Sequence, residues 1–314
     1  MTWYDDAEII TRINRLRESR NALILAHNYQ LGEVQDIADF TGDSLELSMI
    51  AAKNAAAVVV FCGVRFMAET AAMLSPEKTV LLPAATAGCL MADMADGEEL
   101  RRLKAQHPEA ITVCYVNSTA AVKAECDWCV TSANAFDIIH LLPADREIIF
   151  VPDKNLGANI IRATGRPMIL WDGFCPTHMR ITPEMIAARR REFPSAKIIT
   201  HPEVRPEVAA LCDEVMSTGG MCRYVKTADC RQLIVATEMG IIHRLRKENP
   251  DLVYIPLSEQ IVCPDMKMTR LIDVLRALES LQPRITVPEA LRERAVLPIR
   301  RMLEKSAQLT TSRS

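Results

Sequence analysis

The stretch DFTGDS, residues 39–44, decides the fold because it recurs in altered form as DWCVTS at residues 127–132 and as DEVMST at residues 213–218. Each copy begins with an aspartate and ends with a hydroxyl residue. The second copy lies 88 positions after the first, and the third lies 86 positions after the second. A repeat with a fixed period indicates similar structural units that arose by duplication.

The same offsets align three apolar runs that end in polar residues. They are LILAHNY at residues 23–29, ITVCYVN at residues 111–117 and IITHPE at residues 198–203. A later apolar run precedes a cysteine in every copy: VLLPAATAGC ends at Cys89, MILWDGFC at Cys175 and VYIPLSEQIVC at Cys263. Helix-like segments such as IITRINRLRESR lead into or separate these runs. We therefore predict the order strand, helix, strand, helix, strand in each unit.

Runs of Val, Ile and Leu separated by helices are typical of parallel sheets that are buried on both faces. We predict an α/β fold of three similar small three-layer domains with parallel sheets, in a pseudo-threefold arrangement around a central active site. The expected modules span residues 1–90, 91–176 and 177–267, and we expect helices at 268–305 to pack on the first module. Open parallel sheets bind ligands beyond the carboxyl ends of their strands, where the aligned polar residues and cysteines fall.

The composition excludes several classes of protein. The 314 residues are 49% hydrophobic and 25% charged, which is typical of globular proteins and excludes a disordered or collagen-like chain. Lys and Arg number 37 against 40 Asp and Glu, with no long basic run, so we expect no nucleic-acid partner. The longest uncharged stretches, residues 55–64 and 79–92, are shorter than the roughly 20 apolar residues of a membrane-spanning helix. We therefore expect no membrane association.

The N-terminal sequence and the cysteine content give an expectation of the cellular compartment. Asp5, Asp6 and Glu8 stand where a secretory signal would be basic, so we expect a cytoplasmic protein. In that reducing compartment, the ten cysteines are not expected to form a disulfide framework. Cysteines that are not core residues are then candidates for metal binding or catalysis.

Cys89, Cys175 and Cys263 share one aligned position and are the candidates for a metal centre. Thiolates favour zinc or an iron–sulfur cluster over hard cations. Three protein ligands leave a fourth position open, where the metal could act as a Lewis acid on a substrate. The other cysteines share no aligned position, and we interpret the CxxC of Cys126 and Cys129 as structural or incidental.

The repeated hydroxyl residues, Ser44, Ser132 and Thr218, fall at predicted helix starts. Capping of these helices is one interpretation. Three helix N-termini aimed at one point would instead form a pocket for a substrate with two or three carboxylates or a phosphate. We favour the pocket because the position is repeated.

Acid–base and hydrogen-bonding side chains stand at the ends of the first strands: His27, Tyr29, Tyr115, Asn117, His201 and Glu203. His27 and His201 occupy equivalent positions, which favours a functional use. Glu203 is a candidate base, and either histidine or Tyr29 could relay a proton to a leaving hydroxyl. The residues alone leave these roles open.

Numerous motifs stand in a characteristic order between about residue 23 and residue 270: AHNYQ, VQDIADFTGDSLELS, FCGVRFMAETA, VPDKNLG, GFCPTH, HPEV, MSTGGM and CPDMKM. Together they resemble the quinolinate synthase family of bacterial and archaeal NAD biosynthesis. The resemblance implies three α/β domains around one [4Fe–4S] cluster per chain, with one cysteine ligand from each domain. It implies a transferase that condenses iminoaspartate with dihydroxyacetone phosphate to give quinolinate, phosphate and water. The iminoaspartate would come from L-aspartate oxidase or aspartate dehydrogenase.

The resemblance also implies roles for residues of this chain. By motif match, the cluster ligands would be Cys89, Cys175 and Cys263, and the unligated iron would act as a Lewis acid. The active site would be lined by His27, Tyr29, Tyr115, Asn117, His201 and Glu203, with anion-binding turns at Ser44, Ser132, Thr218 and Gly219. Some relatives carry CxxCxxC near the third ligand, whereas Pro264, Asp265 and Met266 follow Cys263 here. A redox switch at that motif therefore gets no support.

Other functions stay open on the sequence. Diphthamide-forming enzymes and the diene-diphosphate reductase of isoprenoid synthesis resemble this three-lobed architecture with one cysteine per lobe, but their motifs are not the ones found here. A dehydratase with mononuclear zinc at the three thiolates is a further enzymatic alternative. A non-enzymatic iron–sulfur sensor or carrier would need only the cysteines and would not explain the repeated hydroxyls or the acid–base residues.

Overall fold

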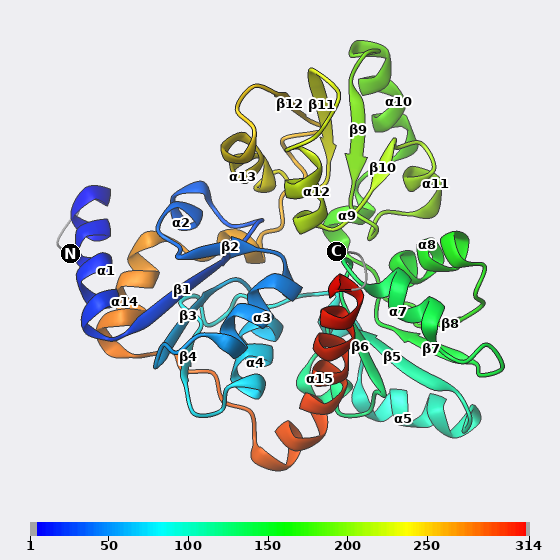
Figure 1. Cartoon of the computed structure of the whole chain (residues 1–314), viewed down its shortest axis with the longest axis horizontal. Coiled ribbons are helices and arrows are strands. Elements are labelled where there is room, and N and C mark those ends of the chain that lie inside the picture. The colour runs from blue at the N-terminus through cyan, green and yellow to red at the C-terminus, as the bar shows by residue number, and fades with distance from the viewer. Residues whose placement is uncertain (1–4, 312–314) are drawn as a thin grey trace.

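The computed structural model describes residues 5–311, so the first four residues of the first expected module lie outside the described part. Figure 1 shows three lobes around a common centre. The strands are β1 (Ala22–His27), β2 (Phe40–Gly42), β3 (Val58–Cys62), β4 (Thr79–Leu81), β5 (Ile111–Tyr115), β6 (Trp128–Val130), β7 (Ile148–Val151), β8 (Ile169–Leu170), β9 (Lys197–Thr200), β10 (Glu214–Val215), β11 (Gln232–Ala236) and β12 (Val253–Pro256). They form three parallel sheets with equivalent orders, β2-β1-β3-β4, β6-β5-β7-β8 and β10-β9-β11-β12. The predicted α/β fold of three similar modules is confirmed.

The helices follow the same threefold plan. One helix leads into each module: α1 (Asp6–Ser19), α5 (Gly97–Gln106) and α10 (Pro183–Glu192). The connecting helices are α2 (Gly32–Asp36), α3 (Ser44–Lys53) and α4 (Arg65–Leu74), then α6 (Ala120–Lys123), α7 (Ala135–Leu141) and α8 (Lys154–Thr164), then α11 (Pro206–Ala209), α12 (Thr218–Tyr224) and α13 (Ile241–Glu248). A short helical turn follows each aligned cysteine: η1 (Ala92–Met94), α9 (Pro176–Met179) and η2 (Asp265–Lys267). Helices α14 (Leu271–Ser280) and α15 (Glu289–Thr311) follow the third module.

The edge strands β2, β6 and β10 are a difference from the prediction, which gave three strands per module. They are two or three residues long and show no alternation that a sequence pattern could reveal. The repeated aspartate holds each of them against the first strand of its module. The carboxylates of Asp39, Asp127 and Asp213 accept backbone N–H groups of that strand at 2.8, 2.8 and 2.7 Å. The repeated aspartate therefore makes the same structural contact in all three modules.

Replacing Asp127 by alanine should therefore lower the free energy of unfolding by about 1–3 kcal/mol, because the N–H of Thr112 loses its carboxylate acceptor. Urea unfolding measures the change. The exposed Asp145 of the same module is a matched control, and its replacement by alanine should change stability by less than about 0.5 kcal/mol. Equal stability of the two variants would contradict a structural role for Asp127.

Both faces of the first sheet are buried, as its continuous apolar runs predict. Ile24 and Ala26 of β1 belong to a core that includes Ile13 of α1 and Leu275 of α14. Leu25 belongs to a second, larger core that continues through all three modules. Apolar burial on both faces fixes the strand, and with it the polar residues at its carboxyl end.

The two C-terminal helices lie on different modules. Helix α14 packs against α1 of the first module, whereas α15 packs against α6 and β6 of the second module and against α4 of the first. Figure 1 shows α15 between these two lobes. Asn134 donates to the hydroxyl of Ser306 at 2.8 Å, and Arg301 donates to the carbonyl of Asp127 at 2.6 Å. Within residues 5–311, every helix is too short or too polar to cross a bilayer.

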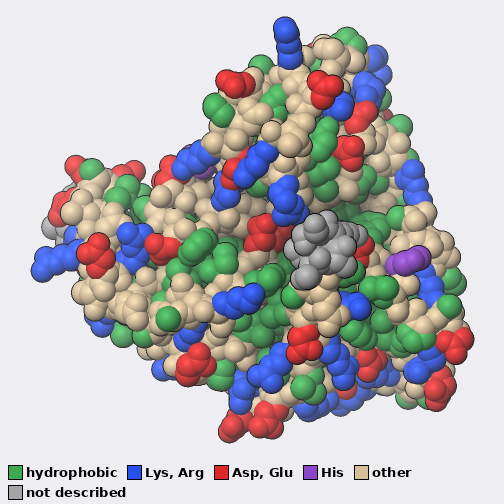
Figure 2. Space-filling view, viewed as in Figure 1, with side chains coloured by type: hydrophobic (Ala, Val, Ile, Leu, Met, Phe, Trp, Pro, Cys, Tyr) green, Lys and Arg blue, Asp and Glu red, His purple; other side chains and the backbone are tan. Residues whose placement is uncertain are grey.

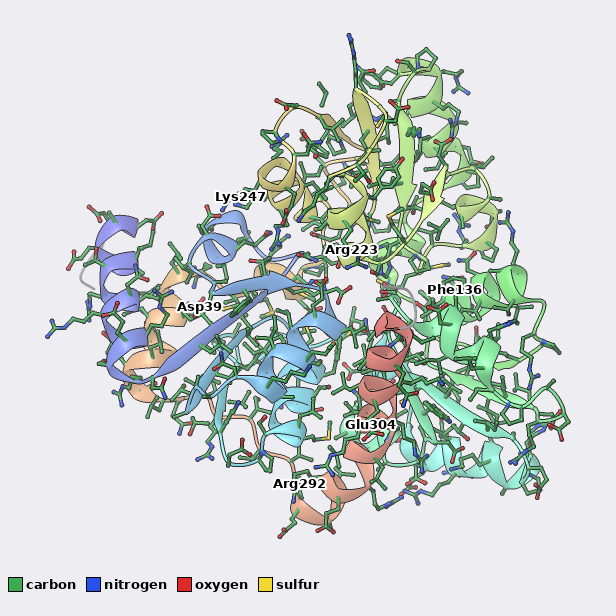
Figure 3. All side chains as sticks on the ribbon, viewed as in Figure 1. Asp39, Phe136, Arg223, Lys247, Arg292 and Glu304 are labelled. Atoms are coloured by element: carbon green, nitrogen blue, oxygen red, sulfur yellow. The ribbon has the colours of Figure 1, made fainter. Side chains whose placement is uncertain are left out.

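Polar contacts also join the third module to the other two. Arg223 of α12 forms an ion pair with Glu46 of α3 at 3.1 Å. Asn159 of α8 donates to the carbonyls of Pro202 and Val204 at 2.9 and 2.8 Å. Figure 3 shows Arg223 and Lys247 on the third lobe where it borders the first. On the face seen in Figure 2, Lys and Arg side chains are interspersed with Asp and Glu, in keeping with a net charge of −3.

Candidate active site

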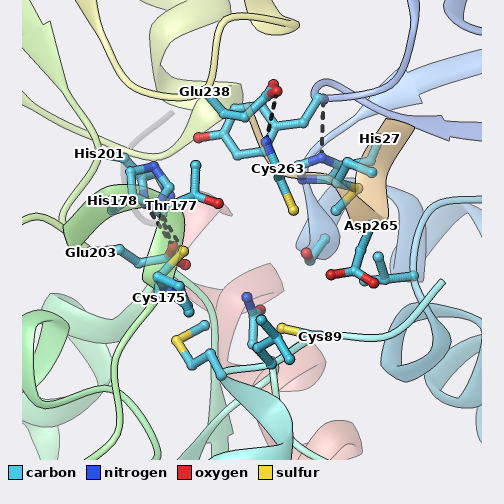
Figure 4. A pocket seen from close by; sticks show the side chains of 18 of the residues that line it. His27, Cys89, Cys175, Thr177, His178, His201, Glu203, Glu238, Cys263 and Asp265 are labelled. Atoms are coloured by element: carbon cyan, nitrogen blue, oxygen red, sulfur yellow. Dashed lines mark hydrogen bonds and ion pairs between the residues drawn. The ribbon is translucent and has the colours of Figure 1, made fainter. Parts of the chain in front are cut away.

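The carboxyl ends of the first strands converge on one cavity of about 270 Å³ where the three modules meet. His27 ends β1, Tyr115 ends β5 and His201 directly follows β9. These residues are only 6%, 3% and 4% exposed, so each is nearly enclosed although it lines the cavity. Figure 4 shows side chains from three lobes around this pocket. The aligned positions of the repeat thus meet in space.

The predicted site residues, with one exception, line this cavity: His27, Tyr29, Ser44, Cys89, Tyr115, Asn117, Ser132, Cys175, His201, Glu203, Thr218 and Cys263. The exception is Gly219, the second residue of α12. A side-chain carbon there would lie 2.6 Å from a carboxylate oxygen of Asp43, so glycine allows α12 to approach α3 closely. Its place in the fold is the packing of the first module against the third.

The repeated hydroxyls line the cavity, and the neighbouring residue caps the helix in two of the three modules. Asp43 caps α3, and Ser217 caps α12, each by accepting hydrogen bonds from backbone N–H groups. Ser44 and Thr218 are the first residues inside those helices. The interpretation of Ser44 and Thr218 as caps is therefore wrong, and their hydroxyls remain available to the cavity.

Two of these hydroxyls contact side chains of another module. The hydroxyl of Ser132 lies 3.1 Å from Nε2 of His201, and that of Thr218 accepts a hydrogen bond from the Asn28 amide at 3.0 Å. The side-chain oxygen of Asn117 is buried and has no hydrogen-bond partner among the described residues. It is an acceptor that a polar ligand in the cavity can satisfy.

A chain of hydrogen-bonded side chains borders the cavity and draws on all three modules. The Tyr29 hydroxyl lies 2.6 Å from the Thr237 hydroxyl, which lies 2.8 Å from Nε2 of His178. Nδ1 of His178 lies 2.8 Å from one oxygen of Glu203, and the other oxygen accepts a hydrogen bond from Tyr115 at 2.7 Å. Figure 4 shows His178, His201 and Glu203 together on one side of the pocket. Glu203 is therefore held by groups that can exchange protons with it.

Sequence reasoning missed two members of this chain. His178 stands three positions after Cys175 on the short helix α9, a spacing that brings both side chains to one face, so the GFCPTH motif carried a usable signal. Thr237 follows β11, and the equivalent positions after β3 and β7 are Gly63 and Pro152. The repeat therefore gave no signal for Thr237.

Burial and neighbouring charges set the protonation of these groups. Burial raises the pKa of Glu203, but His201 and His178 beside it and the hydrogen bond from Tyr115 lower it more, so its pKa lies well below the usual range. Burial, with the charge of Glu203, raises the pKa of Tyr29 and of Tyr115 well above 10. At neutral pH, Glu203 is thus a carboxylate and both tyrosines are neutral donors.

We expect the metal-free protein to lose stability as the pH falls below about 6.5. Burial lowers the pKa of His27 to about 3 and that of His201 to about 4. Between these values and 6.5 the unfolded chain binds more protons than the folded one, so acid favours unfolding. At pH 5 each histidine should cost about 2 kcal/mol relative to pH 7.

Urea unfolding at both pH values tests this expectation. His27→Asn should lose about 2 kcal/mol less than the unaltered protein on acidification. His140→Asn, at an exposed position, should keep the original dependence. An unchanged dependence in His27→Asn would contradict a buried neutral imidazole.

The three aligned cysteines fit an iron–sulfur group. They come from three loops and line the same cavity. Burial raises the pKa of Cys89 to about 12, and it raises the pKa of Cys175 and Cys263 as well. The charge of Glu203 and, to a smaller extent, that of a neighbouring cysteine raise the pKa of Cys89 and of Cys175 further. A soft metal centre that displaces their protons would remove this cost.

A second donor set shares one of these cysteines. The sulfur of Cys175, a ring nitrogen of His178 and a carboxylate oxygen of Glu203 lie within 4.8 Å of one another. Sulfur, nitrogen and oxygen donors of this kind suit a single zinc ion. The structure thus contains two candidate donor sets for a metal, which share Cys175.

Comparisons with known proteins find a family and curated relatives of this chain. The family model of the quinolinate synthetase A proteins matches residues 11–304. A quinolinate synthase of Dehalococcoides mccartyi (strain CBDB1) is 57% identical over 292 residues, which cover 93% of this chain and 96% of the relative. The quinolinate synthases of Methanoregula boonei and Geotalea uraniireducens are 54% and 52% identical, over 95% and 96% of this chain and 99% and 98% of the relatives. Because these matches span all three modules and reach into α15, the chain belongs to the quinolinate synthetase A family.

Proposed function

We propose that this enzyme condenses iminoaspartate with dihydroxyacetone phosphate and releases quinolinate, one phosphate and two waters. The observation that carries the proposal is the threefold contribution to one cavity. Each module supplies a cysteine, a hydroxyl residue and an acid–base or hydrogen-bonding residue at a strand end. Family membership and the names of the relatives support the same reaction. A sensor or carrier would not need this combination.

We propose that Cys89, Cys175 and Cys263 hold one [4Fe–4S] cluster per chain. Their sulfur donors, their separate loops and their shared cavity support this ligand set. When bound, the cluster would supply a Lewis acid for substrate oxygen. The thiols must lose their protons for this, and their raised pKa values in the metal-free protein make cluster binding favoured by higher pH.

The polar residues of the cavity would bind and orient the two anionic substrates. Ser44, Ser132 and Thr218 offer hydroxyl donors from three modules, and Ser44 and Thr218 do so at helix N-termini. Asn117 adds an amide group. Together they suit carboxylates and a phosphate, the groups that the two substrates carry.

Glu203 would be the general base, because it is an enclosed carboxylate at neutral pH. A proton that it accepts from a substrate carbon or nitrogen can pass to His178, which is neutral before the transfer. Alternatively, Tyr115 can donate its own proton to a departing hydroxyl and take the proton of Glu203 in its place. His27 and His201, at equivalent strand ends, would contact substrate as neutral imidazoles. Enclosure by three modules limits the access of bulk water to reactive intermediates.

The substrates place the enzyme after a reaction that forms iminoaspartate. L-aspartate oxidase or aspartate dehydrogenase would supply it, as the resemblance implies. All ten cysteines are free thiols, which supports the proposal that the enzyme works in the reducing cytoplasm.

The test is the formation of quinolinate by anaerobically reconstituted protein from oxaloacetate, ammonia and dihydroxyacetone phosphate. Chromatography with mass detection should find quinolinate, and omission of dihydroxyacetone phosphate should abolish it. No product from iron-replete protein would reject the proposal.

A single zinc ion is the second candidate for the cofactor, favoured by the group of Cys175, His178 and Glu203. Iron, sulfide and zinc analysis distinguishes the two. About four iron and four sulfide per chain support the cluster, whereas one zinc and no sulfide support the alternative.

A further inference from the structure

Two of the cysteine-bearing loops are linked by a hydrogen bond. The backbone N–H of Gly88 donates to a carboxylate oxygen of Asp265 at 3.1 Å, across 177 positions of the chain. Gly88 directly precedes Cys89, and Asp265 stands two positions after Cys263. A side chain of the loop that follows the third sheet thus holds the backbone of the loop that follows the first sheet. Figure 4 shows Asp265 at the pocket with Cys263 and Cys89.

The loop that carries Asp265 has a firm attachment of its own. Glu238, which is 0% exposed, accepts a hydrogen bond from the backbone N–H of Cys263 at 3.2 Å and forms an ion pair with Lys267 at 2.9 Å. Lys267 also donates to the carbonyl of Tyr29 in the first module. A side-chain carbon at position 240 would clash with the Lys267 nitrogen, so Gly240 leaves the space that this contact needs. These contacts therefore hold the segment that carries Asp265 in place.

The loop that carries Cys89 is held at its other end as well. The indole N–H of Trp171, next to β8 of the second module, donates to the carbonyl of Met94 at 2.7 Å. The loop from Gly88 to Met94 thus has contacts with the third module and with the second. At its first end, the carbonyl of Ala87 accepts the backbone N–H of Arg65 within the same module at 2.9 Å, and Asp265 supplies the hydrogen bond from another module.

We propose that Asp265 is a positioning residue that fixes the Cys89 loop relative to the Cys263 loop. Its carboxylate acts as a hydrogen-bond acceptor for Gly88, so both thiols are ordered before a metal centre binds. Ordering a ligand loop in advance removes an entropy cost from binding and slows release. The effect on the metal centre rests on the proposed iron–sulfur function, whereas the link between the loops does not.

The test compares Asp265→Ala with Asp265→Asn. Alanine removes the acceptor, whereas the asparagine amide oxygen can still accept the N–H of Gly88. In metal-free protein, hydrogen exchange of residues 86–94 should be about fivefold faster in Asp265→Ala, the factor expected for one lost hydrogen bond. Asp265→Asn should exchange like the unaltered protein. After reconstitution, loss of iron to a chelator should be faster in Asp265→Ala by a similar factor and restored in Asp265→Asn.

Two further variants complete the design. Asp93→Ala removes a negative charge from the Cys89 loop and should change neither measurement, because Asp93 is exposed and its carboxylate forms no hydrogen bond or ion pair within residues 5–311. Asp265→Glu keeps the charge but shifts the oxygens, should behave like Asp265→Ala, and replaces it if the alanine variant does not fold.

Several outcomes would overturn the proposal. Unchanged hydrogen exchange of residues 86–94 in both Asp265→Ala and Asp265→Glu would do so, because the hydrogen bond between Gly88 and Asp265 would then not order the Cys89 loop. Equal acceleration in Asp265→Asn or in Asp93→Ala would show that charge, and not the hydrogen bond, matters. If the unaltered protein binds no iron, the cofactor assignment fails, while the exchange comparison still decides the role of Asp265.

Discussion

Cys175→Ala is expected to abolish iron binding, whereas Cys126→Ala is expected to leave it in place. Cys175 lines the cavity at the start of α9, while Cys126 is buried in the second module and donates to the carbonyl of Val122 at 3.1 Å. Removal of one of three thiolate ligands should reduce the iron from about four atoms per chain to less than about one. Iron and acid-labile sulfide in anaerobically reconstituted protein measure this change.

The two variants control for each other, because each removes one thiol. Circular dichroism should find both folded, since Cys175 is a pocket residue and a cysteine-to-alanine change at Cys126 should cost about 1–2 kcal/mol. Iron that stays in Cys175→Ala and disappears from Cys126→Ala would overturn the ligand assignment.

Glu203→Gln is expected to keep the iron and the fold but to lower kcat by about 10²–10⁴-fold. The carboxylate accepts a hydrogen bond from Tyr115 at 2.7 Å and lies 2.8 Å from a ring nitrogen of His178. Glutamine retains one oxygen, turns the other position into a donor, and cannot take up a proton at neutral pH. The measurement is quinolinate formed per unit time and per bound iron.

Glu207→Gln is the matched control. Glu207 is exposed and its carboxylate pairs only loosely with Arg205, at 3.5 Å. This variant should turn over like the unaltered enzyme. Activity of Glu203→Gln within tenfold of the unaltered enzyme, with a full complement of iron, would contradict the role of Glu203 as base.

The repeat made the architecture and much of the site predictable. Equivalent strands in equivalent sheets end at equivalent places, so alignment alone brings His27, Tyr115 and His201 to one centre. The same reasoning brings the three cysteine loops together. It did not give the edge strands, which depend on one aspartate hydrogen bond and not on an apolar pattern.

Contacts between modules were beyond the reach of pattern analysis. Thr237 meets Tyr29 across 208 positions, and Asp265 meets Gly88 across 177. The residue types threonine and aspartate do not predict such a partner, because the packing of whole sheets against each other determines the contact. Asp43, and not Ser44, caps α3. Aspartate and serine differ little in free energy as helix caps, so the sequence did not show which of the two neighbours has this role.

The position of helix α15 in the chain determines when one contact between lobes can form during synthesis. This last described segment is the one that bridges the first and second lobes, through α4 on one side and α6 and β6 on the other. Because α15 follows the third lobe in the chain, it is synthesised after all three lobes. The seam between the first two lobes is therefore completed by a helix that is synthesised after the third lobe.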